Sequence, residues 1–161
     1  MIEQDVFDED WAMAAARQFA ESAEGKGLKV PVAAVAEVFR QIETIDISLA
    51  GIPRVYTTEE AAEFFDKSPQ WVYWGLKPRE KGGGGLFYYP PDDEHPEPRP
   101  IEPEKRGKRG ILRYNLDLIK DMGVSLYQHR TIDEEGLQEI VRKIHLARIG
   151  RWTPIPKAKG G

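Results

Sequence analysis

Apolar positions near the start of the chain recur with the period of an α-helix. Trp11, Ala15 and Phe19 are spaced by four, which predicts an apolar face on a helix over residues 8–24. A Gly-Lys-Gly sequence ends this helix, and Pro31 opens a second apolar run of the same period. Because the connection is short, we expect the two helices to form an antiparallel hairpin. The hairpin either enlarges the core of the chain or provides a surface for dimerisation.

The middle of the chain, YTTEEAAEFFDKSPQWVYWGL, predicts two short helices joined by a tight turn. Thr57 is suited to cap the first helix, and Glu60 three residues later completes a capping box. Ser68 is a favoured cap for the second helix, and Pro69 suits its first position, where no N–H is needed. The turn falls at Asp66, a residue type that tolerates the left-handed backbone conformation. This arrangement is typical of a helix-turn-helix.

Apolar side chains are expected to hold these two helices together. Phe65 shares the inner face of the first helix with two alanines, and Val72 and Leu76 of the second helix would pack back on it. The second helix also carries Trp71 and Trp74, of which we expect one in the core. Its remaining polar and aromatic side chains face solvent or a partner.

The pattern T-x-E-E-A-A-E-x-F-D-x-S-P-x-x-V resembles the DNA-binding unit of MerR-like regulators and phage excisionases, over residues 55–122. In that family a β-hairpin wing follows the helix-turn-helix, and an Arg-Tyr pair precedes the next helix. Here Leu86–Tyr89 and Ile111–Tyr114 are expected to form the wing strands. The helix capped by Asn115 is expected to end at Gly123. The resemblance therefore implies a winged helix-turn-helix.

The resemblance also implies which side chains meet double-stranded DNA. The front of a recognition helix enters the major groove, where Gln70 suits bidentate contact with adenine. Tyr73 suits a phosphate or a thymine methyl group, and Lys77 a phosphate or guanine. The full predicted DNA-binding set is Ser68, Gln70, Trp71, Tyr73, Trp74, Lys77, Lys105, Arg106, Lys108, Arg109 and Arg113.

A long loop over residues 90–110 is expected between the wing strands. The glycines Gly82–Gly85, which precede this loop, are expected to form a flexible segment leading into it. The many prolines of the loop are expected to make it stiff and partly disordered. The sequence KRGKR at its end is either a contact to the DNA backbone or minor groove or a solvated basic run. The acidic stretch Asp92–Glu94 either stays exposed or screens these positive charges.

Candidates for catalysis or metal binding are few. The chain has no cysteine, which excludes disulfides, thiolate metal sites and a cysteine nucleophile. His95, His129 and His145 are scattered along the sequence, without a nucleophile–base pair or metal-ligand spacing. The glycine run lacks the Lys-Ser/Thr of a phosphate-binding loop. We therefore expect no enzyme activity, no metal and no cofactor.

Charge changes sign along the chain, although the total is only −4. Residues 1–66 carry 14 acidic and 5 basic side chains, whereas residues 67–161 carry 13 acidic and 18 basic ones. The basic part begins at the predicted recognition helix, which indicates an anionic partner. Nothing resembles a signal peptide or a membrane span, so we expect a cytoplasmic protein that joins the nucleoid by binding DNA.

These elements predict a mainly α fold with a small β-hairpin. We expect an N-terminal helical region, accessory or dimerising, over residues 1–53 and a winged helix-turn-helix over residues 54–123. Residues 124–161 would add a C-terminal helix capped by Asp133 and a basic tail. Residues 44–49, where apolar and polar positions alternate, are expected to form either a short strand or a fraying helix end.

The residues and the resemblance together predict sequence-specific binding of double-stranded DNA. The expected role is that of a phage or prophage regulator, either a recombination directionality factor or a transcriptional repressor. A homodimer or a cooperative oligomer on DNA is the expected assembly. The alternative is a protein–protein interaction module built on a winged helix without DNA readout. Salt dependence separates the two, because contacts to phosphates weaken steeply as salt rises.

Overall fold

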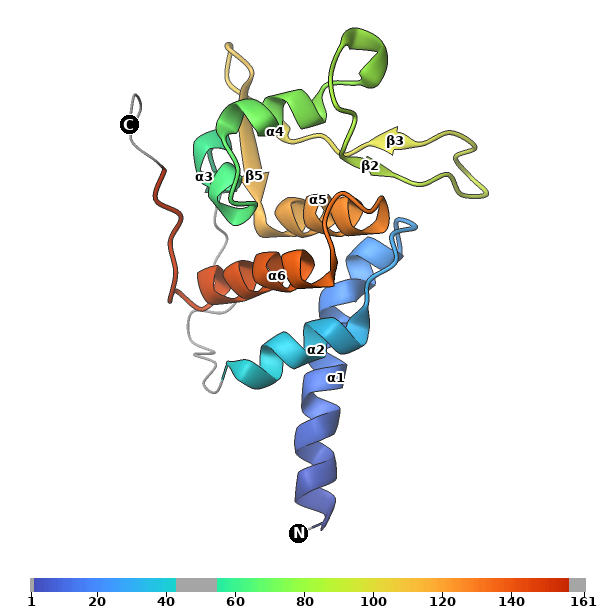
Figure 1. Cartoon of the computed structure of the whole chain (residues 1–161), viewed down its shortest axis with the longest axis vertical. Coiled ribbons are helices and arrows are strands. Elements are labelled where there is room, and N and C mark those ends of the chain that lie inside the picture. Colours follow the sequence, from blue (N-terminus) through green and yellow to red (C-terminus); the bar gives the residue numbers. More distant parts are fainter. Residues whose placement is uncertain (1, 43–54, 157–161) are drawn as a thin grey trace.

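The computed structural model describes residues 2–42 and 55–156, with side chains from Trp11 onward. This part is mainly α-helical with a small antiparallel sheet, as expected from the sequence (Figure 1). The strand or helix end predicted over residues 44–49 and the predicted boundary after residue 53 lie outside the described residues. The helices are α1 Ile2–Glu24, α2 Val32–Gln41, α3 Thr58–Phe64, α4 Pro69–Leu76, α5 Leu116–Gln128 and α6 Glu134–Arg148.

The two N-terminal helices pack on each other and on the rest of the fold. Ala12, Ala16 and Phe19 are buried, whereas Trp11 is 40% exposed, so the expectation that Trp11 belongs to the apolar face is wrong. Phe19 meets Phe39 of α2 edge to face, with ring centroids 5.9 Å apart. Figure 1 shows α2 lying across α1 rather than along it, and α2 also packs on α6. The pair therefore enlarges the core, which is one of its two predicted roles.

The local sequence fixes the ends of α3 and α4. Thr57 Oγ1 accepts the N–H of Glu60 at 3.2 Å, and Glu60 Oε1 accepts the N–H of Thr57 at 2.9 Å. Ser68 Oγ accepts the Trp71 N–H at 3.2 Å at the start of α4. Asp66 has a φ of 54°, the left-handed conformation expected at the turn. The predicted capping box, second cap and turn are all confirmed.

Strand β5 lies at the centre of a three-stranded sheet with the order β1–β5–β4. Both neighbours run antiparallel to β5: Tyr56 pairs with Tyr114 on one side, and Lys105 with Leu112 on the other. A separate two-stranded sheet joins β2 and β3. The strands are β1 Val55–Tyr56, β2 Tyr88–Tyr89, β3 Arg99–Pro100, β4 Glu104–Arg106 and β5 Ile111–Asn115.

The predicted pairing of residues 86–89 with residues 111–114 is wrong. Strand β5 takes β4 as its hairpin partner, across a short turn at residues 107–110. The predicted loop over residues 90–110 therefore contains two strands of its own. Phe87, from the expected wing strand, is 4% exposed and packs against aromatic rings at the α3–α4 turn and on α4. Its apolar side chain serves the core instead of a wing.

The glycine-rich run Gly82–Gly85 packs in an ordered conformation on the C-terminal end of α4. The expectation that this run is a flexible segment is therefore wrong. The run follows a short 3₁₀ helix, η2 (Arg79–Lys81). The N–H groups of Gly84 and Leu86 donate to the carbonyl oxygens of Trp74 and Gly75, at 2.7 and 2.8 Å. These carbonyls at the helix end thereby gain partners that α4 itself does not supply. A Cβ on Gly84 would lie 2.6 Å from Trp74 Cζ3, so glycine is required for this close approach.

The change Gly84→Ala is expected to lower the free energy of unfolding by about 1–3 kcal/mol, because the added methyl group overfills a packed site. Urea unfolding followed by tryptophan fluorescence measures this loss. Gly25→Ala is the control, since its added Cβ would have only ordinary van der Waals contacts, at 3.4 and 3.6 Å, and its φ is not positive. An equally small loss in both variants would show that the contact between Gly84 and Trp74 is not tight.

Helix α5 is longer than predicted and ties the sheet to the helical layer. It continues through Gly123 to Gln128, so the expected end at Gly123 is wrong. The ideal Cβ position of Gly123 lies 3.0 Å from Ile140 Cγ2, so this glycine allows α6 to pack closely. Before α5, the Tyr114 phenol accepts a hydrogen bond from Thr58 at 3.1 Å. Burial raises the pKa of Tyr114 to about 12, and the phenol therefore stays neutral at ordinary pH.

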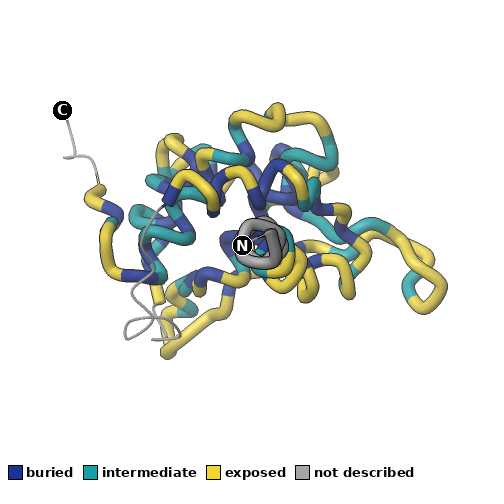
Figure 2. The backbone as a smooth tube through the Cα atoms, turned by 90° about the horizontal axis from the view of Figure 1, so that it is seen from below, coloured by how far each residue is buried: buried dark blue, intermediate teal, exposed yellow. Residues whose placement is uncertain are grey.

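One hydrophobic core joins the N-terminal helices, the sheet and the C-terminal helix. In Figure 2 the buried positions gather where these elements meet, and the β2–β3 hairpin projects from them with mostly exposed positions. Trp152, after α6, packs edge to face on Phe64 with ring centroids 4.8 Å apart, so the beginning of the predicted basic tail is held on the core. Within the described ranges, no helix is both long and apolar enough to span a membrane.

Candidate nucleic-acid interface

Helix α4 presents one exposed face made of polar and aromatic side chains. Gln70, Tyr73, Trp74 and Lys77 follow at intervals of three and four residues, the spacing that places side chains on one side of a helix. All four are exposed, and Tyr73 and Trp74 each keep 48% of their surface accessible. The opposite side of α4 is buried through Val72. Four of the predicted site residues are thus brought together on one surface.

Two other residues that were predicted to contact DNA, Ser68 and Trp71, instead stabilise the fold around α4. The hydroxyl of Ser68 is engaged as the helix cap. Trp71 is only partly exposed, and its ring packs against Phe65 at 6.2 Å and Phe87 at 5.9 Å. Lys67 Nζ lies 5.7 Å from the centre of the Trp71 ring. Trp71 is therefore the tryptophan that contributes to the core, and Trp74 is the exposed one.

The β4–β5 turn carries a compact group of positive side chains. Lys105, Lys108 and Arg109 are exposed, and none of the three has a salt bridge within the described residues. Gly107 and Gly110 have φ values of 77° and 64°, which permit the tight reversal that presents the two cations between them. The turn is therefore a short positively charged tip rather than a long loop.

The predicted basic run is divided by the strand register. Arg106 donates to Glu104 from Nε at 3.0 Å and from Nη2 at 3.2 Å, so its charge is locally neutralised. Glu104 is also the cross-strand partner of Arg113. Arg113 is partly buried and donates to the Leu112 carbonyl oxygen at 3.2 Å. Arg106 and Arg113 are therefore less available to an anionic partner than the cations of the β4–β5 turn.

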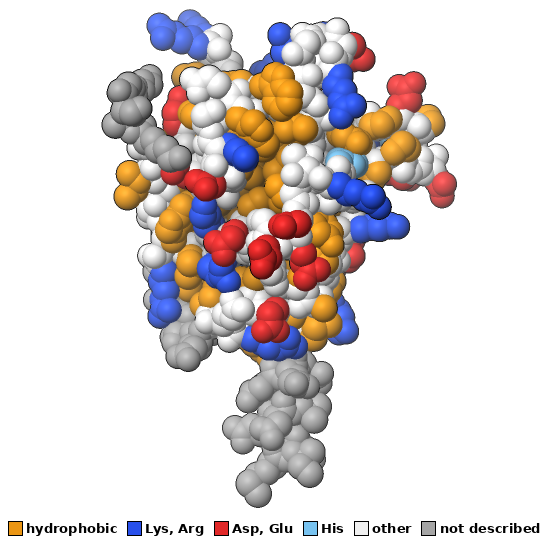
Figure 3. Space-filling model, viewed as in Figure 1, with side chains coloured by type: hydrophobic (Ala, Val, Ile, Leu, Met, Phe, Trp, Pro, Cys, Tyr) orange, Lys and Arg blue, Asp and Glu red, His pale blue; other side chains and the backbone are white. Residues whose placement is uncertain are grey.

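Helix α4 and the β4–β5 turn lie at the same end of the molecule. Both are at the top of Figure 1, above α5, α6 and the N-terminal helices. In Figure 3 several positive side chains stand along this upper edge, together with a few acidic ones, and a cluster of acidic side chains lies lower, over α6.

The acidic stretch at residues 92–94 lies at the tip of the β2–β3 hairpin, which projects away from the β4–β5 turn in Figure 1. Asp92 accepts the backbone N–H of His95 at 2.6 Å, and Arg99 Nη2 lies 3.5 Å from its other oxygen. The hydrogen bond from the His95 backbone lowers the pKa of Asp92, with smaller contributions from the His95 ring and Arg99. This acid is thus paired locally, and the alternative in which it screens the basic turn has no support in the fold.

Sequence reasoning missed two cations beside α4. Arg79 and Lys81 belong to η2, which stands at the same upper edge in Figure 1, and both are exposed. Arg79 Nε donates to the Gly84 carbonyl oxygen at 3.3 Å, which fixes η2 against the glycine-rich run. The sequence KPREK directly after α4 was the available signal, since positive residues following a recognition helix extend its charged surface.

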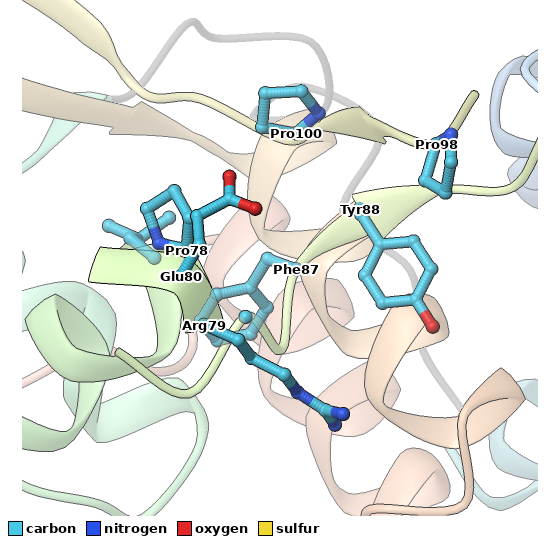
Figure 4. A pocket seen from close by; sticks show the side chains of 9 residues that line it. Pro78, Arg79, Glu80, Phe87, Tyr88, Pro98 and Pro100 are labelled. Atoms are coloured by element: carbon cyan, nitrogen blue, oxygen red, sulfur yellow. The ribbon is translucent and has the colours of Figure 1, made fainter. Parts of the chain in front are cut away.

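An apolar hollow of about 420 Å³ separates η2 from the β2–β3 hairpin. Figure 4 shows Pro78, Arg79 and Glu80 on one side of it and Tyr88, Pro98 and Pro100 on the other. Glu80 is its one carboxylate, and no histidine lines it. The lining therefore does not provide the acid–base pair that a hydrolytic site needs.

The histidines are not assembled into a reactive centre. His129 stacks on Tyr88 with ring centroids 3.8 Å apart, and its Nδ1 lies 3.1 Å from the Tyr88 hydroxyl. His145 packs on Phe39 in the helical layer. Among the described residues, no group of three or more potential metal ligands lies close enough together to hold an ion.

Comparisons with known proteins give a family without an assigned activity. A family model described as Domain of unknown function (DUF7229) matches residues 46–147, which include α3, α4, all five strands, α5 and most of α6. The matched part thus contains both the exposed face of α4 and the β4–β5 turn. No curated protein and no solved structure matches the chain.

Proposed function

This chain belongs to the DUF7229 family, a domain of unknown function, and we propose that it binds double-stranded DNA in a sequence-specific manner. In this proposal α3 and α4 act as a helix-turn-helix and the β4–β5 hairpin acts as its wing. The observation that carries the proposal is the exposed face of α4, with Gln70, Tyr73, Trp74 and Lys77, on a helix at the same end of the molecule as a positively charged hairpin turn. A helix bearing amide and basic tips fits the major groove, and a cationic wing fits the flanking backbone.

Each side chain of this face has a distinct role in the proposal. Gln70 lies in the first turn of α4, where its amide donates one hydrogen bond to the edge of an adenine and accepts another from it. Tyr73, one turn later, contacts a phosphate or a thymine methyl group. Lys77, at the C-terminal cap, neutralises a phosphate. Trp74, whose ring lies against Gly84, fills apolar space between the helix and the sugar-phosphate backbone.

Replacing Gln70 by alanine is expected to cost about 1–3 kcal/mol on the preferred duplex and almost nothing on random duplexes. The reason is that Gln70 reads a base edge, whereas nonspecific affinity comes from phosphate contacts. Selection of binding sites from a random library, followed by fluorescence anisotropy on the selected duplex, supplies the measurement. The matched control is Gln41→Ala, which removes an exposed glutamine at the end of α2. Equal losses on specific and random DNA would contradict base reading by α4.

In the cell we propose that this DNA binding serves a phage or prophage regulator. Recombination directionality factors act at attachment sites, whereas transcriptional repressors act at promoters. A genome-wide occupancy map in the native host separates the two, because the positions of the bound sites identify the process. A homodimer or a cooperative oligomer on DNA is part of the proposal, and stoichiometry on the selected duplex tests it.

The exposed aromatic pair favours a second candidate, a protein–protein interaction module. Tyr73 and Trp74 are neighbouring large side chains that are both exposed on α4, and aromatic residues are enriched where proteins meet. Such a contact would change little with salt, whereas DNA binding through phosphates loses affinity steeply. The salt dependence of binding therefore decides between the two candidates.

A further inference from the structure

A second cavity lies within the helical layer and shares no residue with α4 or the β4–β5 turn. Its volume is about 390 Å³, and α1, α2, α5 and α6 all contribute to its walls. Binding sites for small molecules commonly span about 300–1,000 Å³. Its lining combines apolar side chains with charged and titratable ones, namely Phe19, Phe39, Ile149, Asp117, Lys120, His145 and Arg148.

Lys120 brings a buried positive charge to this cavity. The residue is 4% exposed, and its ammonium group donates to the Phe19 carbonyl oxygen at 2.8 Å and to Ser22 Oγ at 2.7 Å. The nearest carboxylate, that of Asp117, is 3.5 Å away on a side chain that is 66% exposed. Neutral oxygens thus hold the ammonium group in place, but a solvent-screened acid compensates its charge only weakly.

Asp121 also influences Lys120, but its own bonds point elsewhere. Its Oδ2 atom accepts from Lys26 Nζ at 2.8 Å and from the Tyr89 hydroxyl at 2.6 Å. Burial lowers the pKa of Lys120, and Asp117 and Asp121 oppose that shift, while Arg148 adds to it. The cation in the cavity therefore has a neighbour of like charge and no buried carboxylate of its own.

His145 and Arg148 add unused polar atoms on one side of α6. His145 Nε2 is buried and has no hydrogen-bond partner in the part of the chain that the structure describes. Its ring packs on Phe39 with centroids 4.9 Å apart. The ring nitrogens lie at the edge of the ring and can still form hydrogen bonds. Burial, and then the charge of Arg148, lower the pKa of His145. Arg148 forms no ion pair with any described residue.

We propose that this cavity binds a small organic carboxylate with a short apolar or aromatic body. The guanidinium of Arg148 is the group best suited to pair with a carboxylate through two parallel hydrogen bonds. His145 Nε2 can donate a further bond to the carboxylate, and the ammonium of Lys120 contributes its charge. The apolar body lies against Phe19, Phe39 and Ile149. A bound anion adds to the partial compensation that Asp117 and Asp121 give the positive charge of Lys120 beside Arg148.

Binding of benzoate to the full chain tests the proposal, with benzamide as a neutral probe of the same shape. Two-dimensional ¹H–¹⁵N NMR spectra recorded during titration should show benzoate shifting amide signals of α1, α2, α5 and α6. Benzoate should bind at least tenfold more tightly than benzamide, which is a difference of about 1.4 kcal/mol. Inorganic phosphate should bind more weakly than benzoate, because it leaves the apolar wall unfilled.

Two variants on α6 test the assignment to residues. Arg148→Gln should weaken benzoate binding at least tenfold, whereas Arg142→Gln should leave it unchanged, because Arg142 pairs with Glu139 outside the cavity. Equal affinity for benzoate and benzamide, equal losses in both variants, or shifts confined to other elements would overturn the proposal. The absence of any shift in the unchanged protein at millimolar benzoate would do the same. None of these results bears on DNA binding, which is measured without the probe.

Discussion

Replacing Phe65 by alanine is expected to lower the free energy of unfolding by about 3–5 kcal/mol, the usual cost of removing a buried phenyl ring. Phe65 is 7% exposed, and its ring lies 6.2 Å from that of Trp71 and 6.0 Å from that of Phe87. It therefore joins the end of α3, the inner side of α4 and the segment after the glycine-rich run.

Urea unfolding with circular dichroism detection measures this loss. Tyr73→Ala is the matched control, since Tyr73 is an aromatic residue of α4 that is 48% exposed, and its loss should stay within about 0.5 kcal/mol. A small effect of Phe65→Ala, comparable to that of the control, would mean that the two helices are not held by this contact. Their packing would then have to rest on the alanines of α3 and on Val72.

The elements that the sequence predicted correctly are those whose signals are local. Thr57 with Glu60, and Ser68 with Pro69, define two helix starts within a few residues, and the structure has both caps. Asp66 marks the turn in the same way through its own backbone preference. Such signals depend on side-chain-to-backbone bonds over three residues, so they survive whatever the rest of the chain does.

The sheet was predicted poorly because its pairing is set over long distances. Residues 86–89 have the apolar composition of a strand, but Phe87 is needed in the core beside α4. Strand β4, with the sequence EKR, has a composition typical of a loop and becomes a strand through its pairing with β5. Helix α5 passes Gly123 for a similar reason, since contact with Ile140 outweighs the local preference of glycine for a helix end.

The candidate site was predicted in its helical part and only partly in its hairpin. Gln70, Tyr73, Trp74 and Lys77 are spaced with the period of an α-helix. They would therefore share one side of the helix however it packed on the rest of the fold. The division of the basic run needed the strand register. Residues two apart in a strand share one face, so Glu104 comes to lie beside Arg106 once β4 is known.

Changing Lys105, Lys108 and Arg109 together to alanine is expected to weaken binding to every duplex about equally. If each cation neutralises one phosphate, the slope of log affinity against log salt should fall by about 2.7, or 0.9 for each contact. At 0.1 M salt this corresponds to a loss of about 500-fold in affinity. Arg106 is left in place because Glu104 already compensates its charge.

Fluorescence anisotropy at several salt concentrations, on the selected duplex and on a random one, gives both slopes. The control changes Arg17, Lys29 and Arg40 to alanine, which removes the same net charge from exposed positions of α1, of α2 and of the connection between them. Because α1 and α2 lie on the far side of the fold from the β4–β5 turn in Figure 1, the control should keep the original slope. If both variants lost affinity equally, only the total charge of the protein would matter, and the hairpin would have no specific place at the DNA. If neither slope changed, α4 alone would have to account for binding.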